Sequence, residues 1–133
     1  MLSRRLLTRA LGVDAATVRV DGCELVDGEV LIRLRPRVVH RWRCPVCGRR
    51  RPGYDSGWWR RWRALDFGRT QVFITAQVPR VRCPDHGVLV AAVPWARHGA
   101  RHTYAFEQVA AWCAVEMSAT AATRLLRCSW RTI

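Results

Sequence analysis

Metal-binding residue types recur in two short motifs that have the same form. The first, CPVCG, begins at Cys44, and the second, CPDHG, begins at Cys83. In each motif, Pro fixes φ after the first ligand, and Gly permits a left-handed turn after the second. Two such turns that face each other supply four ligands to a tetrahedral zinc ion. The spacing therefore predicts a structural zinc site made of Cys44, Cys47, Cys83 and His86.

Other interpretations of the cysteines explain the pattern less well. The chain has six cysteines, but residues 1–11 lack the apolar run of a signal peptide, so we expect a reducing compartment rather than disulfides. A redox CxxC motif would need a thioredoxin-like βαβ setting and would leave Cys83 and His86 without a role. A catalytic zinc is disfavoured because four protein ligands leave no position for water. The remaining cysteines are expected to be small buried residues: Cys23, Cys113 and Cys128.

The charge of the chain is strongly basic, and all of its basic residues other than histidine are arginines. The formal net charge is +13 and the isoelectric point is about 11.3. Between Arg33 and Arg63 there are eleven arginines and one acid, Asp55. Four tryptophans interleave with them, although about half could instead form the core of a small zinc domain. Because guanidinium groups match phosphates, we expect nucleic-acid contacts from Arg41, Arg43, Arg49, Arg50, Arg51, Arg60, Arg61 and Arg63.

The first third of the chain predicts one helix and one β-hairpin. Leucines at three- and four-residue spacing in residues 1–16 predict an amphipathic helix that ends at Gly12. In residues 18–35, Asp27-Gly28 separates two β-rich runs and is a strong hairpin signal. In the second run, apolar residues alternate with others, which predicts one apolar face. That face would carry Val30, Ile32 and Leu34.

The middle of the chain predicts a zinc ribbon. Residues 48–61 are rich in Gly and Pro and are predicted to form an irregular loop. Residues 62–65 and 71–78 predict a second strand pair, which Pro79 is expected to end. Each zinc motif would then follow a strand, and the metal would add about 10–16 kcal/mol to folding. Residues 97–102 predict a solvated basic linker, in which a metal pair made of His98 and His102 is disfavoured.

The last third predicts helices. Thr103 is expected to cap a helix over residues 103–117, and Ser118 a second one over residues 119–126. Ser129 would then cap the start of a third helix. Two helices, a turn and a third helix indicate a helix-turn-helix, although an αα-hairpin that serves only as core fits equally well. In a helix-turn-helix the third helix reads bases, so we expect DNA contacts from Trp130 and Arg131. Because this helix would be very short here, we expect little base specificity.

The predicted fold class is α+β, with a small zinc-ribbon-like β-hairpin domain followed by a truncated helix-turn-helix. We expect three parts: an N-terminal helix and hairpin (1–35), a zinc-binding domain (36–100) and the truncated helix-turn-helix (101–133). No apolar run approaches the length of a membrane span, so we expect no membrane partner.

The motifs and the helical tail together resemble the N-terminal part of ISL3-type insertion-sequence transposases. The shared stretches are the two zinc motifs, residues 64–68, 81–87 and 93–97, and the run from Trp112 to Thr132. Members of this family carry a zinc finger, a helix-turn-helix and a DDE-type catalytic domain. The resemblance covers about residues 20–133. It implies a structural Zn²⁺ on the four predicted ligands and DNA-binding helices over residues 118–133.

The resemblance implies a DNA-binding fragment of a transposase that binds element ends during DNA transposition and recombination. The expected partners are double-stranded DNA at transposon ends and a full-length transposase, in the cytoplasm and on the nucleoid. We expect no enzyme activity, because strand transfer requires three carboxylates around two metal ions and the ten acids here are scattered. Two alternatives stay open: an RNA-binding zinc ribbon, and a protein-interaction module.

Overall fold

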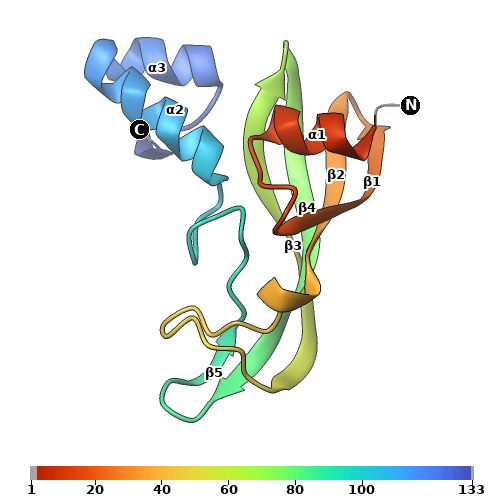
Figure 1. Cartoon of the computed structure of the whole chain (residues 1–133). Helices are drawn as coiled ribbons and strands as arrows, with labels where there is room; N and C mark the ends of the chain where they lie inside the picture. The colour runs from red at the N-terminus through yellow and green to blue at the C-terminus, as the bar shows by residue number, and fades with distance from the viewer. Residues whose placement is uncertain (1–2, 133) are drawn as a thin grey trace.

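A mixed sheet with helices at one end forms the framework of the protein (Figure 1). The computed structural model describes residues 3–132. The strand order is β1-β2-β4-β3, and β5 pairs with β4. This arrangement confirms the predicted α+β class. The strands are β1 (Val18–Val26), β2 (Glu29–Pro36), β3 (Gly53–Phe67), β4 (Thr70–Cys83) and β5 (Gly87–Val90). The helices are α1 (Arg4–Leu11), α2 (Tyr104–Glu116) and α3 (Ala119–Leu126), with 3₁₀ turns η1 (Val38–His40) and η2 (Trp130–Thr132).

The β1–β2 hairpin forms where the sequence predicts it. Asp27 and Gly28 both have positive φ, 51° and 78°, as a two-residue turn of the mirror-image type requires. Ile32 and Leu34 are buried, which confirms the predicted apolar face. The helix α1 precedes this hairpin and ends at Gly12, as predicted, with a left-handed φ of 70°.

The strand β3 is longer than predicted. It begins at Gly53, inside the segment predicted to be a loop, so that prediction is wrong. The pairing of β3 with β4 shifts register on both sides of Asp55, and these bulges absorb the extra residues. At Gly57 φ is 68°, and a Cβ atom there would lie 1.7 Å from the carbonyl oxygen of Val78. Gly57 therefore belongs to a bulge that only glycine can form.

The strand β4 also extends further than predicted, because it passes through Pro79 to Cys83. Val78 pairs with Trp58 and Arg80 pairs with Asp55, so Pro79 lies opposite the bulge, where no ladder donor is needed. Its carbonyl oxygen accepts a hydrogen bond from the backbone N–H of Ala91 at 2.9 Å. The strand thus runs without interruption into the second zinc motif.

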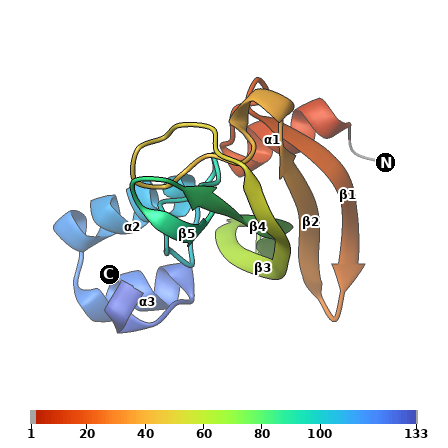
Figure 2. The same ribbon diagram turned by 90° about the horizontal axis from the view of Figure 1, so that it is seen from below.

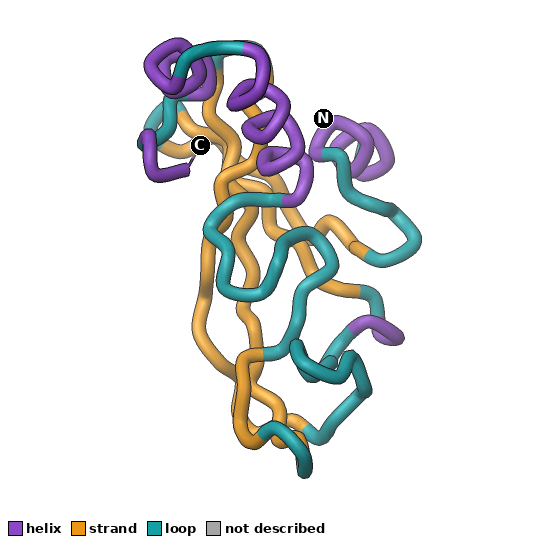
Figure 3. Tube along the Cα trace, turned by 90° about the vertical axis from the view of Figure 1, so that its left-hand side faces the viewer, coloured by secondary structure: helices purple, strands orange, loops and turns teal. Residues whose placement is uncertain are grey.

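Parallel pairing of β2 with β4 joins the N-terminal hairpin to the long β3–β4 hairpin. Figure 3 shows the long strands running from the helical end of the molecule to the loops at the other end. The three-part division of the chain stays a prediction, and the first two parts share this sheet. One face carries the main core, in which Trp62 and Trp95 pack edge to face at 5.3 Å. Other core residues are Leu7, Leu11, Ile32, Ala64, Val72 and Ile74.

The helices α2 and α3 form a second core beside the long hairpin (Figure 2). Thr103 and Ser118 cap them as predicted, each accepting a backbone N–H three residues on. Buried residues in this core are Phe106, Ala110, Cys113, Ala122 and Leu126. Among the described residues, no helix is long and apolar enough to cross a membrane.

Two expectations about burial need correction. Cys113 is buried as predicted, but Cys23 is exposed and Cys128 is partly buried. Cys23 lies on β1, an outer strand of the sheet, beyond a register shift between Val20 and Gly22, in a stretch where residues 23–26 are all exposed. About half of the four tryptophans between Arg33 and Arg63 were expected in the core, but only Trp62 is buried, and Trp42, Trp58 and Trp59 are exposed. Outside that segment, Trp95 is buried and Trp112 is exposed.

Candidate metal centre and nucleic-acid interface

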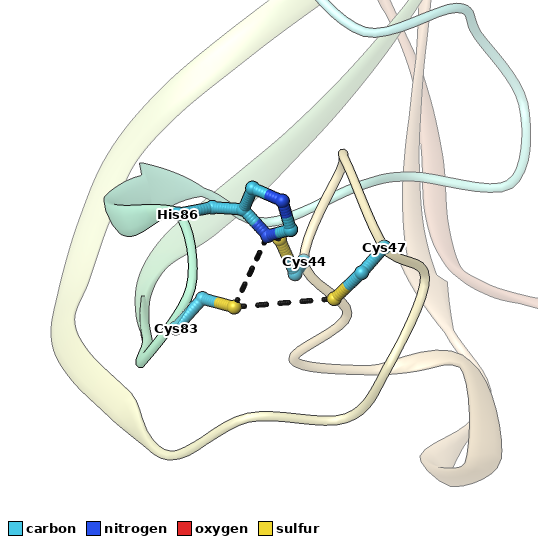
Figure 4. A group of neighbouring side chains, drawn as sticks. All are labelled: Cys44, Cys47, Cys83 and His86. Carbon is cyan, nitrogen blue, oxygen red and sulfur yellow. Dashed lines mark hydrogen bonds between the residues drawn. The ribbon is translucent and has the colours of Figure 1, made fainter.

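The four predicted zinc ligands meet at the end of the sheet opposite to α2 and α3 (Figures 1 and 4). Cys83 is the last residue of β4, and His86 immediately precedes β5. Cys44 and Cys47 lie in the loop between η1 and β3. The prediction that the first motif directly follows a strand is therefore wrong, because η1 separates it from β2. The second motif does follow its strand.

Local hydrogen bonds hold each motif in a tight turn. In the first, the backbone N–H of Gly48 donates to the carbonyl of Cys44 at 2.9 Å, and the N–H of Cys44 donates to the carbonyl of Arg49 at 2.9 Å. Gly48 and Gly87 have φ of 72° and 81°, the left-handed conformation that the sequence pattern predicts. Each turn thereby aims both of its ligand side chains toward the other turn.

The ligand atoms have the spacing of a tetrahedron. Nδ1 of His86 lies 3.4 Å from Sγ of Cys83 and 3.7 Å from Sγ of Cys44. The sulfurs of Cys47 and Cys83 are 3.9 Å apart, and all four atoms lie within 4.8 Å of one another. Zinc bonds of about 2.3 Å to sulfur and about 2.1 Å to nitrogen place tetrahedral ligands about 3.6–3.8 Å apart. Three thiols and one imidazole at this spacing fit a zinc ion.

The backbone around the site favours thiolates, the form of cysteine that binds metal. Burial raises the pKa of Cys83, but the N–H of Asp85 and contacts with His86 outweigh it and lower that pKa to about 6. The pKa of Cys47 is lowered chiefly by a hydrogen bond from the backbone N–H of Arg49. The turns therefore prepare two of the three sulfurs to ligate a cation.

Comparison with known proteins assigns both ends of the molecule to the same family. Residues 40–86 match the family model described as the zinc-finger of transposase IS204/IS1001/IS1096/IS1165. Residues 91–133 match the helix-turn-helix domain of transposase family ISL3. The chain belongs to the ISL3 transposase family. This finding confirms the resemblance that its two zinc motifs and its helical tail predicted.

Two curated relatives of this ISL3 chain come from Mycobacterium tuberculosis. Each is described as the transposase for insertion sequence element IS1557, one from strain CDC 1551/Oshkosh and one from strain ATCC 25618/H37Rv. The identity to each is 46% over 140 aligned residues, and the match covers the whole of this chain. The chain spans 31% of the length of these relatives. No solved structure matches it.

Arg51 in the ISL3 zinc ribbon has a different environment from the one predicted. Its side chain is 19% exposed, and its Nη2 lies 3.6 Å from Oδ2 of Asp85. Burial lowers the pKa of Arg51, but hydrogen bonds and attraction to the sulfurs of Cys47 and Cys83 raise it overall. Three thiolates around a Zn²⁺ ion would leave one net negative charge, which this guanidinium would be placed to offset. Arg51 faces the metal centre, a role that its position in a run of arginines concealed.

The other arginines predicted to contact DNA separate into two groups. Arg41 donates to the carbonyl of Pro36 at 2.8 Å. Arg43 donates to the carbonyls of Val39 and Gly48. Both therefore hold the backbone of the zinc loop. Arg63 is buried and bonds to the end of α3, so its guanidinium is not available to a nucleic acid. The exposed members are Arg49, Arg50, Arg60 and Arg61.

A cationic groove lies between β3 and residues 97–102 of the helix-turn-helix region. Its volume is about 850 Å³, and none of the residues that line it carries a carboxylate. Residues 97–102, predicted to be a solvated linker, form one of its walls. His98 is exposed, but the ring of His102 stacks on Phe106 at 4.7 Å, so the two histidines have separate environments. The exposed arginines that line the groove are Arg60, Arg61, Arg97 and Arg101.

The predicted base-reading residues lie at the end of the described chain. Trp130 and Arg131 belong to η2, which follows α3. Arg131 is exposed, and its backbone N–H donates to Oγ of Ser129 at 3.3 Å. The side chain of Trp130 and all of Ile133 lie outside the part that the structure describes. Ser129 and Thr132 line the same groove as the exposed arginines, so η2 and the groove form one continuous surface.

Proposed function

We propose that this chain is the zinc-dependent DNA-binding part of an ISL3 transposase and that it binds the ends of an insertion element. The observation that carries the proposal is the groove beside η2. Four exposed guanidinium groups line it, and it lies between the zinc-bearing hairpin and the helix-turn-helix. Two of the four also pair with acids outside the groove lining, Arg61 with Glu29 and Arg97 with Glu107. Such a surface attracts a polyanion and repels basic partners.

The zinc ion has a structural role in this proposal. Four protein ligands close its coordination shell, so no position is left for a water or a substrate. The metal would join the loop of Cys44 and Cys47 to the β4–β5 turn, two segments that are distant in the sequence. By doing so it would fix the far end of the long hairpin whose other end carries the helices.

The arginines of the groove are proposed to hold phosphates, and η2 to approach the bases. Phosphate contacts set the position of the protein on the duplex but carry no sequence information. In a helix-turn-helix the third helical element faces the major groove, which is the place of Trp130 and Arg131. Arg49 and Arg50, which are exposed in the loop of the first zinc motif, are proposed as further phosphate contacts outside the groove.

In the whole transposase this module would position a catalytic part on the element ends. Cleavage and joining of DNA would then be the work of other segments, and we propose no enzyme activity for this chain alone. Its place of action would be the nucleoid in the cytoplasm. A full-length transposase is a further candidate partner, since it would carry the same module.

A salt titration tests the DNA-binding proposal. Fluorescence anisotropy would follow zinc-loaded protein binding to a duplex that carries the element end and to a shuffled duplex. Each phosphate contact contributes about −0.9 to the slope of log K against log salt. The Arg60→Gln/Arg101→Gln variant should therefore lower the magnitude of the slope by roughly two such units.

The matched control is Arg5→Gln/Arg9→Gln, because these exposed arginines lie on α1. This variant removes the same charge from a helix that does not line the groove. An equal loss of slope in both variants would show that net charge alone drives binding, and the groove would not be the site. A tighter complex with single-stranded RNA than with duplex DNA would favour the alternative of an RNA-binding zinc ribbon.

A further inference from the structure

Two adjacent tryptophans on β3 are exposed to solvent. The side chains of Trp58 and Trp59 are 76% and 63% exposed. The fold buries two other indoles, Trp62 and Trp95, in its core, whereas Trp42 and Trp112 are exposed singly. Trp58 and Trp59 differ from these because they lie next to each other. Exposed apolar groups gathered at one place commonly mark a binding surface.

These indoles lie on an open edge of the sheet. β3 is the last strand in the order β1-β2-β4-β3. Its outer side is covered at Arg63, where the backbone bonds to Arg101 and Thr103. Among the described residues, no strand pairs with the outer side of residues 58–61. Since neighbouring side chains on a strand point to opposite faces, one indole stands on each side of this edge.

Arginines outnumber acids beside the indoles, since the hollow at Trp59 is lined by Arg33, Arg60 and Arg61 and by one acid, Glu24. Arg60 and Arg61 follow them directly, and both are exposed. The guanidinium of Arg61 lies 3.7 Å from the centroid of the Phe73 ring, on the face that also carries Trp59. Glu29 is 3.7 Å from Arg61, but half of the Arg61 side chain remains exposed. Each face of the edge therefore offers one indole beside one guanidinium.

We propose that Trp58 and Trp59, together with Arg60 and Arg61, form a site for unpaired nucleotides of single-stranded DNA. An unpaired base can lie flat on an indole while its phosphate contacts the adjacent guanidinium. In a duplex both faces of a base are already covered by its neighbours, so the indoles have no partner there. The site shares Arg60 and Arg61 with the duplex-binding groove proposed above, but neither indole lines that groove. Variants of the two indoles therefore test this site without changing the groove.

A second copy of the chain is a poorer occupant of this edge. Antiparallel pairing of two copies along residues 58–61 would bring the Arg60 and Arg61 side chains of both copies close together. Like charges across a strand pair are destabilising, and exposed charged residues on an edge strand oppose such pairing. The net charge of +13 on each chain adds further repulsion.

The test compares single-stranded and duplex DNA on the same variants. Anisotropy titrations would use zinc-loaded protein with a short labelled oligo-dT and with a mixed-sequence duplex of the same length. Stacking contributes about 1–3 kcal/mol per base. The Trp58→Ala/Trp59→Ala variant should therefore bind oligo-dT roughly 30-fold or more weakly, while its duplex affinity changes by about twofold or less.

Two further variants separate stacking from structural damage. Trp112→Ala removes a tryptophan that is 61% exposed on α2, and it should leave both affinities unchanged. Trp58→Phe/Trp59→Phe keeps an aromatic ring at each position and should retain most of the oligo-dT affinity. The cobalt absorption of the Cys₃His site would report whether each variant is folded.

Several results would overturn the proposal. One is an unchanged oligo-dT affinity in the folded double alanine variant, and another is an equal loss on oligo-dT and duplex. Tighter binding of oligo-rU than of oligo-dT would assign the surface to RNA. Light scattering that shows a dimer in the wild type, and a monomer in the double alanine variant, would assign the edge to a second copy of the chain.

Discussion

The guanidinium of Arg63, on strand β3, donates to the carbonyl of Leu126, the last residue of α3, at 2.8 Å. It also donates to the carbonyl of Arg127 at 3.1 Å and pairs with Asp66 at 3.0 Å. A cation at the C-terminus of a helix satisfies carbonyls that have no partner within the helix. Arg63 thus joins the sheet to the helix-turn-helix and fixes how the two parts are placed.

Replacement of Arg63 by Met should loosen the helices without affecting the metal centre. The change removes a buried donor and leaves the carbonyl of Leu126 without its partner, which costs about 2–3 kcal/mol. Hydrogen exchange should show faster opening of α3, while zinc affinity stays the same. The control is Arg61→Met, an exposed neighbour that should leave the exchange rates of α3 unchanged. Equal exchange rates in α3 for both variants would contradict this account.

Replacement of Arg51 should affect zinc binding, whereas replacement of Arg49 should affect DNA binding. Because Arg51 lies against the sulfurs of Cys47 and Cys83, Arg51→Gln should weaken zinc binding by about 10-fold or more, as loss of outer-shell partners does. Arg49 is exposed, so Arg49→Gln should leave zinc affinity unchanged and reduce only the salt dependence of DNA binding. Competition with a chromophoric chelator measures zinc affinity. The same zinc affinity in both variants would show that Arg51 does not contribute to the metal centre.

Gly57 should tolerate substitution far less well than Gly28. Both have positive φ, but only at Gly57 would a Cβ atom overlap the backbone, 1.7 Å from the carbonyl oxygen of Val78. Gly28→Ala should lower the free energy of unfolding by about 1 kcal/mol, and Gly57→Ala by more than about 3 kcal/mol. Urea titrations of the zinc-loaded variants provide the comparison. Equal losses would mean that the bulge at Gly57 is not formed.

His102 should make stability depend on pH in a defined direction. Burial lowers the pKa of His102, and the charges of Arg63 and Arg101 lower it further, against a smaller opposite effect of Glu107. As the pH falls, His102 therefore takes up a proton in the unfolded chain before it does so in the folded chain. The free energy of unfolding falls as the pH drops through the ordinary value of 6.5 toward the folded pKa. His102→Gln should remove this contribution.

The measurement is the free energy of unfolding of the wild type minus that of His102→Gln, between about pH 7.5 and pH 5, with zinc in excess. The difference should shrink or change sign as the pH falls, because only the wild type loses stability through this side chain. Loss of zinc ligation at acid pH affects both proteins and cancels in the difference. A difference that grows toward acid pH would show that His102 gains stability from its charged form.

The local features of the fold could be predicted from the sequence. Zinc turns, the Asp27-Gly28 hairpin and the helix caps at Thr103 and Ser118 each depend on residues within a few positions of one another. Long-range pairing could not be predicted in this way. The bulge at Gly57, which admits Pro79 into β4, exists only when the far ends of the long β3–β4 hairpin are aligned, and the parallel pairing of β2 with β4 has no local pattern.

The same limit explains what was missed in the site. The set of four ligands depends on residue types and their spacing in the two motifs, so it could be predicted from the sequence. The arginines looked alike in the sequence, and their roles depend on partners elsewhere. Arg63 is buried against α3, Arg51 lies against the zinc ligands, and Arg101 lines the groove. The number of positive charges along the sequence does not distinguish these three environments.

Zinc content is the most direct test of the central claim, which is that the fold depends on a metal held by the two turns. Elemental analysis of natively purified protein should give one zinc per chain, and Cys44→Ser should lose most of it together with the order of the β4–β5 end. Cys23→Ser, at an exposed cysteine outside the site, should keep the full zinc content. Wild-type protein that is folded and free of zinc, or Cys44→Ser protein that retains one zinc per chain, would contradict the account.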